Sequence, residues 1–230
     1  MFGFGVKTFI DIPEDTKGKL PTELFYKKQR LSDGEIRGRL VNLGIGQGEL
    51  GVSPLQMAVY CAALANRGTI YQPHMVRSIY NRKTHQLQDV ELAYRMLPSF
   101  KTEHWDAIHN GMYDVENTPG GTALGAKVSG IDVCGKTGTA QNPHGEDHAW
   151  FICFAPKVNP KIAMCILVEN AGFGGTISAP IAQRLLTKFF FPHQKDSIEI
   201  KPPAITSAVP EKKIAKVIAK TNKTLAVNPR

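Results

Sequence analysis

The clearest pattern in the sequence is a pair of apolar runs, residues 149–155 and 162–168, which are rich in aromatic and β-branched side chains. A short polar turn containing Asn159 and Pro160 joins them, so the pattern predicts an antiparallel β-hairpin. Neither run alternates apolar with polar residues, which is typical of strands whose two faces are both buried. We therefore expect helices to cover both faces of the sheet that contains this hairpin.

The strongest helix signal begins at Ser53. Pro54 would occupy the first helical position and Gln56 follows three residues after the serine, which together make a capping box. The helix is predicted to end at Gly68, because glycine tolerates the left-handed conformation of a C-terminal cap. The residues expected on its buried face are Leu55, Val59, Ala62 and Ala63.

Other segments follow from periodicity and from turn residues. Two more helices are predicted over residues 99–115 and 178–190. Residues 75–80 predict a strand followed by a polar loop, whereas residues 14–40 are charged and glycine-rich, which indicates a long loop with one helical turn. The buried faces of the two helices are expected to carry Trp105, Ile108 and Met112 in the first, and Ile181, Leu185, Leu186 and Phe189 in the second.

These elements predict one α+β domain over residues 1–190, in which helices flank an antiparallel sheet. Beyond it the composition changes to Lys, Pro, Ala and Thr, which predicts a basic, disordered tail over residues 191–230. The tail carries eight basic and three acidic residues, so it accounts for +5 of the formal charge of +8. Because the excess charge is local and no basic face with interleaved aromatic residues is present, nucleic-acid binding is not predicted.

The sequence gives no sign of a membrane span or an export signal. Its longest apolar runs fall far short of the roughly 20 residues that cross a bilayer. The first residues, Met1 to Gly5, lack the basic and apolar regions of a signal peptide.

No metal site and no cofactor is predicted. The four cysteines have no metal-ligand spacing and are expected to be buried thiols, although Cys153 and Cys165 flank the hairpin turn and could face each other as a disulfide. His144 and His148 flank two acidic residues, but they would need a helix to share a metal, and a loop is expected there. We interpret this segment as a loop that lines the substrate cleft.

Two glycine motifs suggest nucleotide binding. Residues 130–137 match the P-loop pattern, and an apolar run ending at Glu169 could mimic a magnesium-binding strand, so a P-loop nucleotidase is kept as an alternative. The motif requires a helix after Thr137, however, and the glycines and proline that follow would not sustain one. Residues 46–51 match the dinucleotide pattern but lack the acidic residue that would hold a ribose, so a tight loop is predicted.

Residues 133–141 are better interpreted as an edge strand beside the apolar hairpin. The strand places Lys136, Thr137 and Gly138 in succession. A cation and a hydroxyl at an edge can hold a carboxylate, and a glycine lets a substrate backbone approach closely. We predict a substrate-binding site at these residues and Thr139. Lys-Thr-Gly is short and also occurs in surface turns, so the prediction depends on the segments around it.

Several such segments occur in one order along the chain. They are Gly44-Ile45-Gly46-Gln47-Gly48, Ser53-Pro54-Leu55-Gln56-Met57-Ala58, Asn66-Arg67-Gly68, Gly111-Met112, Gly120-Gly121-Thr122-Ala123, Lys136-Thr137-Gly138-Thr139-Ala140-Gln141 and His148-Ala149-Trp150-Phe151. Over about residues 1–190 this series resembles the transpeptidase domain of class B penicillin-binding proteins, most closely penicillin-binding protein 2 of the cell-elongation machinery.

The resemblance implies part of the penicillin-binding/β-lactamase-like transpeptidase fold and a serine acyl-transfer enzyme. Such an enzyme crosslinks peptidoglycan stem peptides that end in D-Ala-D-Ala, and β-lactams acylate it. It implies that Lys136 and Thr137 hold the substrate carboxylate, that Lys136 adds positive field at the nucleophile, and that the Thr139 N–H is an oxyanion donor. The resemblance also implies a family that is anchored in the inner membrane with this domain outside it, and that works with the cell-elongation machinery.

Two of the three family motifs, S-x-x-K and S-x-N, are missing from the chain. None of its eight serines has a lysine three positions later, and none begins S-x-N. Thr16 and Lys19 have the first spacing, but they lie in a polar loop broken by glycine. In the family both motifs lie upstream of the segment that Phe2-Gly3-Phe4-Gly5 resembles.

We therefore expect a C-terminal fragment that is inactive alone and whose missing N-terminal part reflects a split gene or a misannotated gene start. Two alternatives are a half-domain that works beside a separately encoded N-terminal partner, and a noncatalytic remnant that binds peptidoglycan or a protein partner. Without upstream strands, the strand over residues 162–168 is expected to have an unpaired edge, and apolar helix faces are expected to lack cover.

Overall fold

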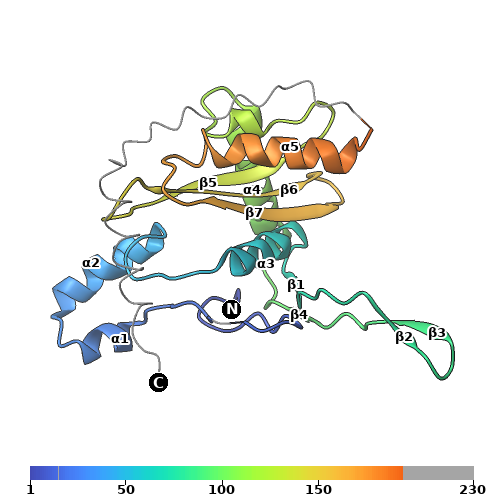
Figure 1. Cartoon of the computed structure of the whole chain (residues 1–230). Coiled ribbons are helices and arrows are strands. Elements are labelled where there is room, and N and C mark those ends of the chain that lie inside the picture. The colour runs from blue at the N-terminus through green and yellow to red at the C-terminus, as the bar shows by residue number, and fades with distance from the viewer. Residues whose placement is uncertain (15, 194–230) are drawn as a thin grey trace, which may run out of the picture. The chain divides into compact units, whose positions relative to one another are not determined.

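The computed structural model describes residues 1–14 and 16–193, which form helices packed on antiparallel strands (Figure 1). The α+β architecture predicted from the sequence is confirmed. The predicted tail lies, from residue 194 onward, outside the described residues. Among the described helices, none combines the length and the apolar character needed to cross a membrane.

The central sheet has three strands in the order β5–β6–β7, and both neighbouring pairs are antiparallel. The strands are β5 (Cys134–Ala140), β6 (His148–Ala155) and β7 (Ile162–Val168). The predicted hairpin is confirmed as β6 and β7, and the segment interpreted as an edge strand is β5. Within the described residues β5 and β7 are the two edges of this sheet.

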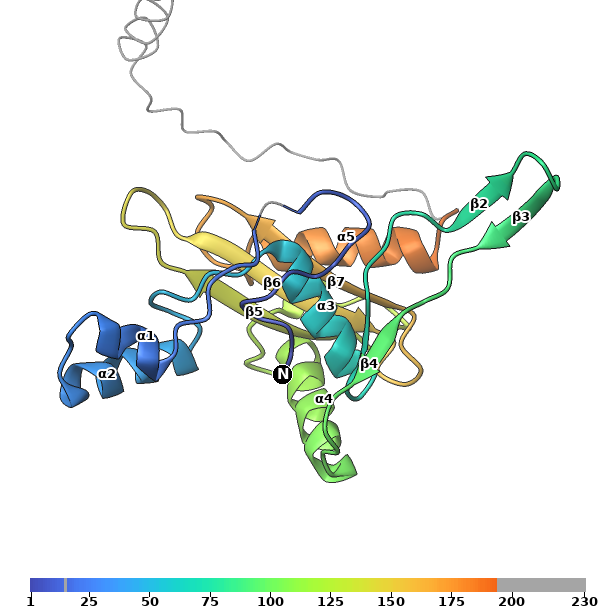
Figure 2. The ribbon, with the colours of Figure 1, turned by 90° about the horizontal axis from the view of Figure 1, so that it is seen from below.

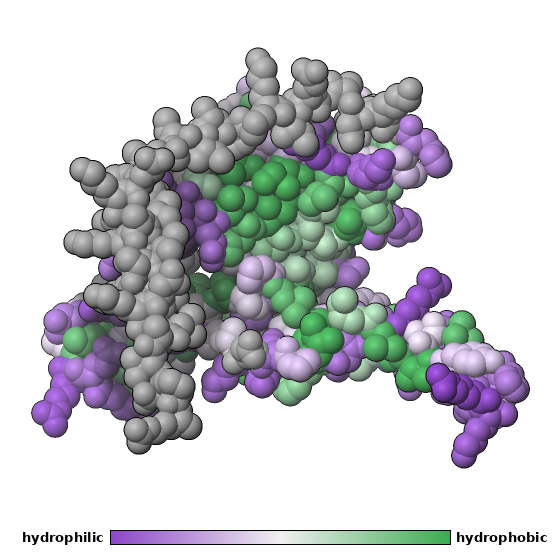
Figure 3. All heavy atoms as spheres, viewed as in Figure 1, coloured by the Kyte–Doolittle hydropathy of each residue, from purple (hydrophilic) through white to green (hydrophobic). Residues whose placement is uncertain are grey.

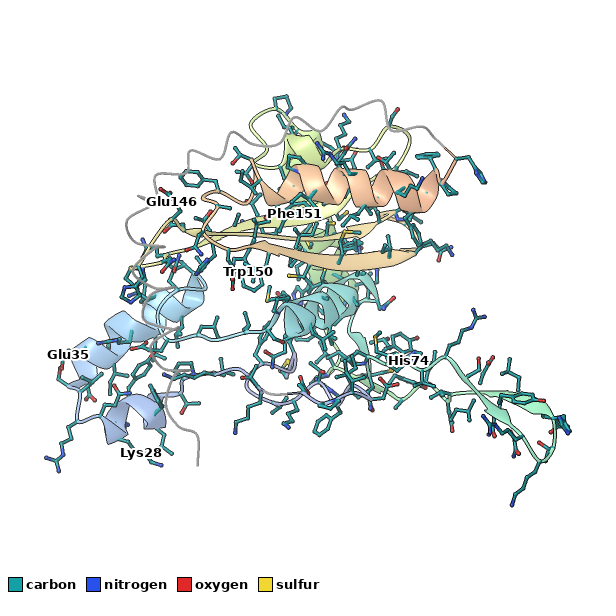
Figure 4. All side chains as sticks on the ribbon, in the orientation of Figure 1. Lys28, Glu35, His74, Glu146, Trp150 and Phe151 are labelled. Carbon is teal, nitrogen blue, oxygen red and sulfur yellow. The ribbon has the colours of Figure 1, made fainter. Side chains whose placement is uncertain are left out.

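Helices cover both faces of the sheet, as expected from its continuous apolar strands. Successive residues of β6 point to opposite faces, and Figure 4 labels Trp150 and Phe151 on either side. Figures 1 and 2 place α3 (Pro54–Ala65) on one face and α5 (Ser178–Phe190) on the other. Residues of α4 (Thr102–Asn117) join the core on the α3 side. The two faces carry separate apolar clusters.

Helix α3 begins as predicted. Ser53 is its N-cap in a capping box with Gln56. The helix ends at Ala65, and Gly68 with φ +102° follows in the left-handed conformation. The Gln56 amide also donates to the Val6 carbonyl oxygen at 2.8 Å, which ties the first residues to the helix. Of the residues predicted to be buried, Ala63 is buried, and Leu55, Val59 and Ala62 are half-buried.

Helix α4 buries Trp105 and Met112 as predicted, but Ile108 is wrong because it remains 39% exposed. The buried residue next to it is His109, whose Nε2 lies 2.8 Å from the Leu64 carbonyl oxygen of α3. The buried face of α4 therefore includes His109 in place of Ile108, the residue that the apolar pattern predicts.

Helix α5 has the predicted limits but a different buried face. Leu186 is buried, together with the small residues Ala179 and Ala182. Small side chains let the helix lie close to the sheet, so the larger apolar residues point away from it. The three residues wrongly predicted to be buried are Ile181, Leu185 and Phe189, which are between 37% and 51% exposed.

The long loop predicted over residues 14–40 is wrong, because this segment folds into α1 (Glu23–Lys28) and begins α2 (Asp33–Gly44). Ser32 forms a capping box with Glu35, and the glycines of α2 meet no neighbouring atoms. Favourable capping therefore outweighs the low helix propensity of glycine on a solvent-exposed helix.

Two small pairs of antiparallel strands follow α3, where one strand and a polar loop are predicted. They are β1 (Thr69–Tyr71) with β4 (Tyr94–Met96), and β2 (Ser78–Asn81) with β3 (Gln86–Asp89). Nearly every residue of β2 and β3 is exposed, and Figure 1 shows this hairpin projecting from the sheet domain. The strand predicted over residues 75–80 overlaps β2, whereas β3 lies in the predicted polar loop, because an exposed polar strand has no apolar pattern.

The disulfide considered between Cys153 and Cys165 is wrong, because all four cysteines are free. In the β6–β7 register Cys153 lies opposite Met164, and Cys165 lies opposite Ile152. This one-residue offset places the two thiols on opposite faces of the sheet. Cys61, Cys134 and Cys153 are buried as predicted, and Cys165 is half-buried.

Candidate functional site

The free edge of β5 carries the predicted site residues. In an antiparallel pair, each residue directs its N–H and C=O together, alternately toward and away from the neighbouring strand. The carbonyl groups of Val133, Thr137 and Thr139 accept hydrogen bonds from side chains off the sheet. These odd-numbered residues therefore face the free edge, while Lys136 and Gly138 pair with β6.

Three different side chains cap the carbonyl groups of this edge. The Asn117 amide donates to the Val133 carbonyl oxygen at 3.3 Å, and the Lys136 ammonium donates to that of Thr137 at 2.8 Å. The Gln47 amide donates to the Thr139 carbonyl oxygen at 2.9 Å. Among the described residues, no group off the sheet accepts from the N–H of Thr137 or Thr139. At Thr137 and Thr139 the edge therefore presents an uncapped donor beside a capped acceptor.

A cavity of about 530 Å³ opens beside this edge, and it contains two of the four predicted residues, Thr137 and Thr139. The Thr137 hydroxyl lies 2.9 Å from the hydroxyl of Thr122. Lys136 and Gly138 do not line this cavity, because alternation along the strand turns them to the opposite face. The other lining residues are Gly121, Thr122, Leu124, Gly125, Phe173, Gly175 and Thr176.

The loop between β7 and α5 closes one side of the cavity, and glycine allows it to approach closely. A methyl group at Gly174 would overlap the carbonyl oxygen of Trp150, and one at Gly175 would overlap that of Thr122. Both neighbours are backbone atoms that cannot rotate away, so only glycine fits. The loop residues Phe173 and Thr176 thereby reach the same cavity as Thr137.

The segment that contains His144 and His148 is the turn between β5 and β6 and the start of β6. It contacts the loop between β7 and α5. His148 begins β6, and its Nδ1 accepts from the Asn170 N–H at 3.1 Å. The Asn142 amide donates to the Asn170 carbonyl oxygen Oδ1 at 2.6 Å, while His144 lies in the exposed turn. Among the described residues no group of three metal-ligating side chains gathers. Neither histidine lines the cavity.

A buried carboxyl group lies behind β5. Glu116 of α4 is fully buried, and neither carboxyl oxygen has a hydrogen-bond partner within the described residues. A methyl group at Gly135 would overlap this carboxyl and the Phe151 ring, so the acid packs directly against the strand. Burial raises the pKa of Glu116 to about 8.

The family model described as "Penicillin binding protein transpeptidase domain" matches residues 1–187. The chain belongs to the penicillin-binding protein transpeptidase family. It is 35% identical over 201 residues to the peptidoglycan D,D-transpeptidase MrdA of Haemophilus influenzae, covering 80% of this chain and 31% of that protein. The chain thus spans about a third of the length of this relative.

Solved structures of penicillin-binding protein 2 have the same fold. The Pseudomonas aeruginosa protein, in complex with WCK 5153, is 32% identical with a TM-score of 0.69, covering 83% of this chain and 42% of that one. The Helicobacter pylori protein, in complex with MreC, is 32% identical with a TM-score of 0.63, covering 82% and 34%. The predicted likeness to penicillin-binding protein 2 is therefore confirmed.

Neither nucleotide-binding alternative has its required geometry. The P-loop match ends within strand β5, which continues to Ala140 where a helix would have to begin. The dinucleotide match, residues 46–51, leads into a backbone bridge between Gly51 and Lys19. Of the glycines in these motifs, Gly46, Gly48 and Gly130 have positive φ values in turns, and Gly135 packs closely within the domain.

The sequence identified β5 but missed the residues that complete the site. Thr122 and Gln47 both belong to segments that carry the family resemblance, but their residue types alone indicate no role. Their contacts with Thr137 and Thr139 cross 15 and 92 residues of sequence, respectively. No local pattern indicates such distant contacts, so only the fold could reveal them.

Proposed function

We propose that this chain supplies the substrate-binding edge of a peptidoglycan D,D-transpeptidase, a serine acyl-transfer enzyme. The acylated serine and the S-x-N motif are then supplied by polypeptide outside these 230 residues, since no S-x-x-K or S-x-N sequence occurs within them. The observation that carries the proposal is the β5 edge: the Lys136 ammonium reaches the outward Thr137 carbonyl oxygen, and the uncapped N–H groups belong to Thr137 and Thr139, which line a hydroxyl-bearing cavity.

The proposed roles follow from the chemistry of this edge. Lys136 and the Thr137 hydroxyl hold the terminal carboxylate of a stem peptide ending in D-Ala-D-Ala, and β-lactams bind in the same way. The Thr139 N–H stabilises the oxyanion as one of two donors, and Gly138 lets the substrate backbone approach. No cofactor and no metal ion is required for this chemistry.

The opposite edge of the sheet supports a partner polypeptide. The outer backbone groups of β7 have no hydrogen-bond partner among the described residues, and exposed apolar residues of α5 lie nearby. Figure 3 shows apolar side chains gathered over β7 and α5. An N-terminal part of the same transpeptidase domain would pair with this edge and bring the serine to the site. A partner from the cell-elongation machinery is proposed on likeness to the Helicobacter pylori relative alone.

A noncatalytic half-domain is the second candidate, favoured by the missing serine. Intact-mass spectrometry after incubation with benzylpenicillin separates the two. The chain is tested alone and together with the translation product of the DNA immediately upstream. We expect no adduct on the chain alone, and an adduct on the upstream product only when the chain is present.

Two variants serve as controls for the role of the edge. Lys136→Met should slow acylation about 100-fold or more, since it removes a charge-assisted contact. Lys83→Met, at the exposed tip of the β2–β3 hairpin, should leave the rate unchanged. An adduct on the chain alone would show that it contains an unrecognised nucleophile. Absence of an adduct both on the chain alone and on the mixture with the upstream product would favour the noncatalytic half-domain.

A further inference from the structure

Gln47 lies in a loop whose geometry directs its side chain to the β5 edge. It follows the end of α2, and its N–H donates to the Asn42 carbonyl oxygen at 3.0 Å. The residues on either side, Gly46 and Gly48, have φ values of +78° and +81°, which side chains other than glycine rarely adopt. Gln47 therefore lies between two residues whose backbone conformation favours glycine.

The amide of Gln47 reaches the carbonyl group of Thr139, one of the two β5 residues that line the cavity. Its Nε2 lies 2.9 Å from the Thr139 carbonyl oxygen, in a half-buried position. A strand that paired with this edge would use both the N–H and the C=O of Thr139. Because Gln47 already satisfies the C=O, the N–H is the group that remains for a bound molecule.

The same arrangement repeats along the edge. Asn117 and Lys136 cap the carbonyl groups of Val133 and Thr137, while no group off the sheet, among the described residues, accepts from the Thr137 N–H. Uncapped N–H groups beside an ammonium form an electropositive edge, which suits a negatively charged oxygen better than a neutral peptide strand.

We propose that Gln47 is a positioning residue for the Thr139 oxyanion donor. Its amide fixes the plane of the peptide after Thr139 and keeps the strand in the register that aims the Thr139 N–H into the cavity. This inference rests on the proposed function, because it concerns the acyl oxygen that develops charge during transfer. Gln47 itself touches neither the substrate nor the nucleophile.

The test uses the chain with its upstream product and measures both the dissociation constant of the initial penicillin complex and the rate of acylation. Gln47→Glu keeps the shape but replaces the amide donor with a carboxylate, which repels the carbonyl oxygen. We expect acylation at pH 7.5 to slow about tenfold, part of the roughly 100-fold or greater cost of losing an oxyanion donor outright. The dissociation constant should change less than about threefold.

A pH profile separates positioning from a merely structural role. Protonation of the introduced glutamate restores a donor, so the ratio of unmodified to variant rates should fall between pH 7.5 and roughly 4.5, where a glutamate of ordinary pKa is about half protonated. Gln88→Glu on the exposed strand β3 is the matched control and should show neither effect.

Each outcome decides one of the two proposals. An adduct that forms equally fast with Gln47 and with Gln47→Glu overturns the positioning role alone, as does a slower rate whose ratio is the same at both pH values. Absence of an adduct with the unmodified chain overturns the proposed function and this inference with it.

Discussion

The two edges of the central sheet differ in how their backbone groups are satisfied. At β5 the outward carbonyl groups of Val133, Thr137 and Thr139 are capped by side chains of the same domain. At β7 the outward residues are Ala163, Cys165 and Leu167. Among the described residues, no hydrogen-bond partner is present for their outward backbone groups. The apolar surface in Figure 3 adjoins this second edge.

The difference indicates two kinds of occupant. An exposed strand edge is a template for another chain, and proteins normally protect such edges. Capped acceptors beside free donors favour an anionic ligand at β5. A complete, uncapped row of donors and acceptors beside apolar side chains favours a paired strand at β7. One edge is thus suited to chemistry and the other to assembly.

The largest expected effect tests which residues of β7 face outward. Met164→Pro removes an N–H that bonds to β6 and should lower the free energy of unfolding by roughly 3 kcal/mol or more. Ala163→Pro removes an N–H that faces outward and should lower it by only about 1 kcal/mol or less. Urea unfolding of both variants measures the difference. Ala163→Pro should nevertheless block assembly with the upstream product, and equal losses of stability in the two variants would contradict the assignment.

The buried Glu116 behind β5 should make stability depend on pH. Its pKa is about 8 in the folded chain, against 4.5 when unfolded, so the folded chain retains a proton that the unfolded chain releases. The stability that this proton contributes should therefore be fully present below pH 4.5. The free energy of unfolding should decline as pH rises toward 8, by roughly 3 kcal/mol between pH 5.5 and 8.

Unfolding by urea at several pH values checks this slope. Glu116→Gln removes the ionisable group and should flatten the pH dependence, whereas Glu91→Gln at an exposed position should leave it unchanged. The neighbouring Cys134 cannot account for the slope, because burial raises the pKa of its thiol to about 12. A parallel slope in Glu116→Gln would show that another group is responsible.

Close packing at the β5 edge gives the next effect. A methyl group at Gly135 would overlap both the Glu116 carboxyl and the Phe151 ring, so Gly135→Ala should cost about 2 kcal/mol. Gly111 of α4 has no neighbouring atoms, and Gly111→Ala should instead stabilise the helix by up to about 1 kcal/mol. Opposite signs in thermal unfolding are expected. A neutral Gly135→Ala would mean that the strand can move away from α4.

The sequence predicted the sheet better than its surroundings for a physical reason. Strands β6 and β7 are buried on both faces, so their apolar runs are unambiguous, and the Ser53 capping box is a local signal. The β2–β3 hairpin has no buried face, and α2 has one buried residue, Ile36, so neither carries an apolar pattern. The prediction of the buried face of α5 was wrong because mainly small residues, and not the large apolar ones, contact the sheet.

The candidate site divides in the same way. Lys136 to Thr139 are adjacent in sequence and could be recognised together, whereas Gln47 and Thr122 reach them only through the fold. The alternation that turns Lys136 away from the cavity follows from strand geometry, but it requires the register of β5 on β6. Residues that position a site are therefore less visible in a sequence than residues that form it.

The smallest expected effect tests the hydroxyl pair at the cavity. Thr122→Val keeps the shape of the side chain but removes the 2.9 Å contact with the Thr137 hydroxyl. Because the pair is exposed to water, unfolding should become easier by only about 0.5 to 1 kcal/mol. Thr122→Ser retains the hydroxyl and should restore most of this loss. In acylation assays of the assembled halves, Thr122→Val should weaken penicillin binding more than Thr122→Ser does, because a free Thr137 hydroxyl no longer keeps one orientation toward the substrate carboxylate. Equal binding by the two variants would mean that β5 alone determines the orientation of the Thr137 hydroxyl. Thr122 would then be only a structural part of the cavity wall.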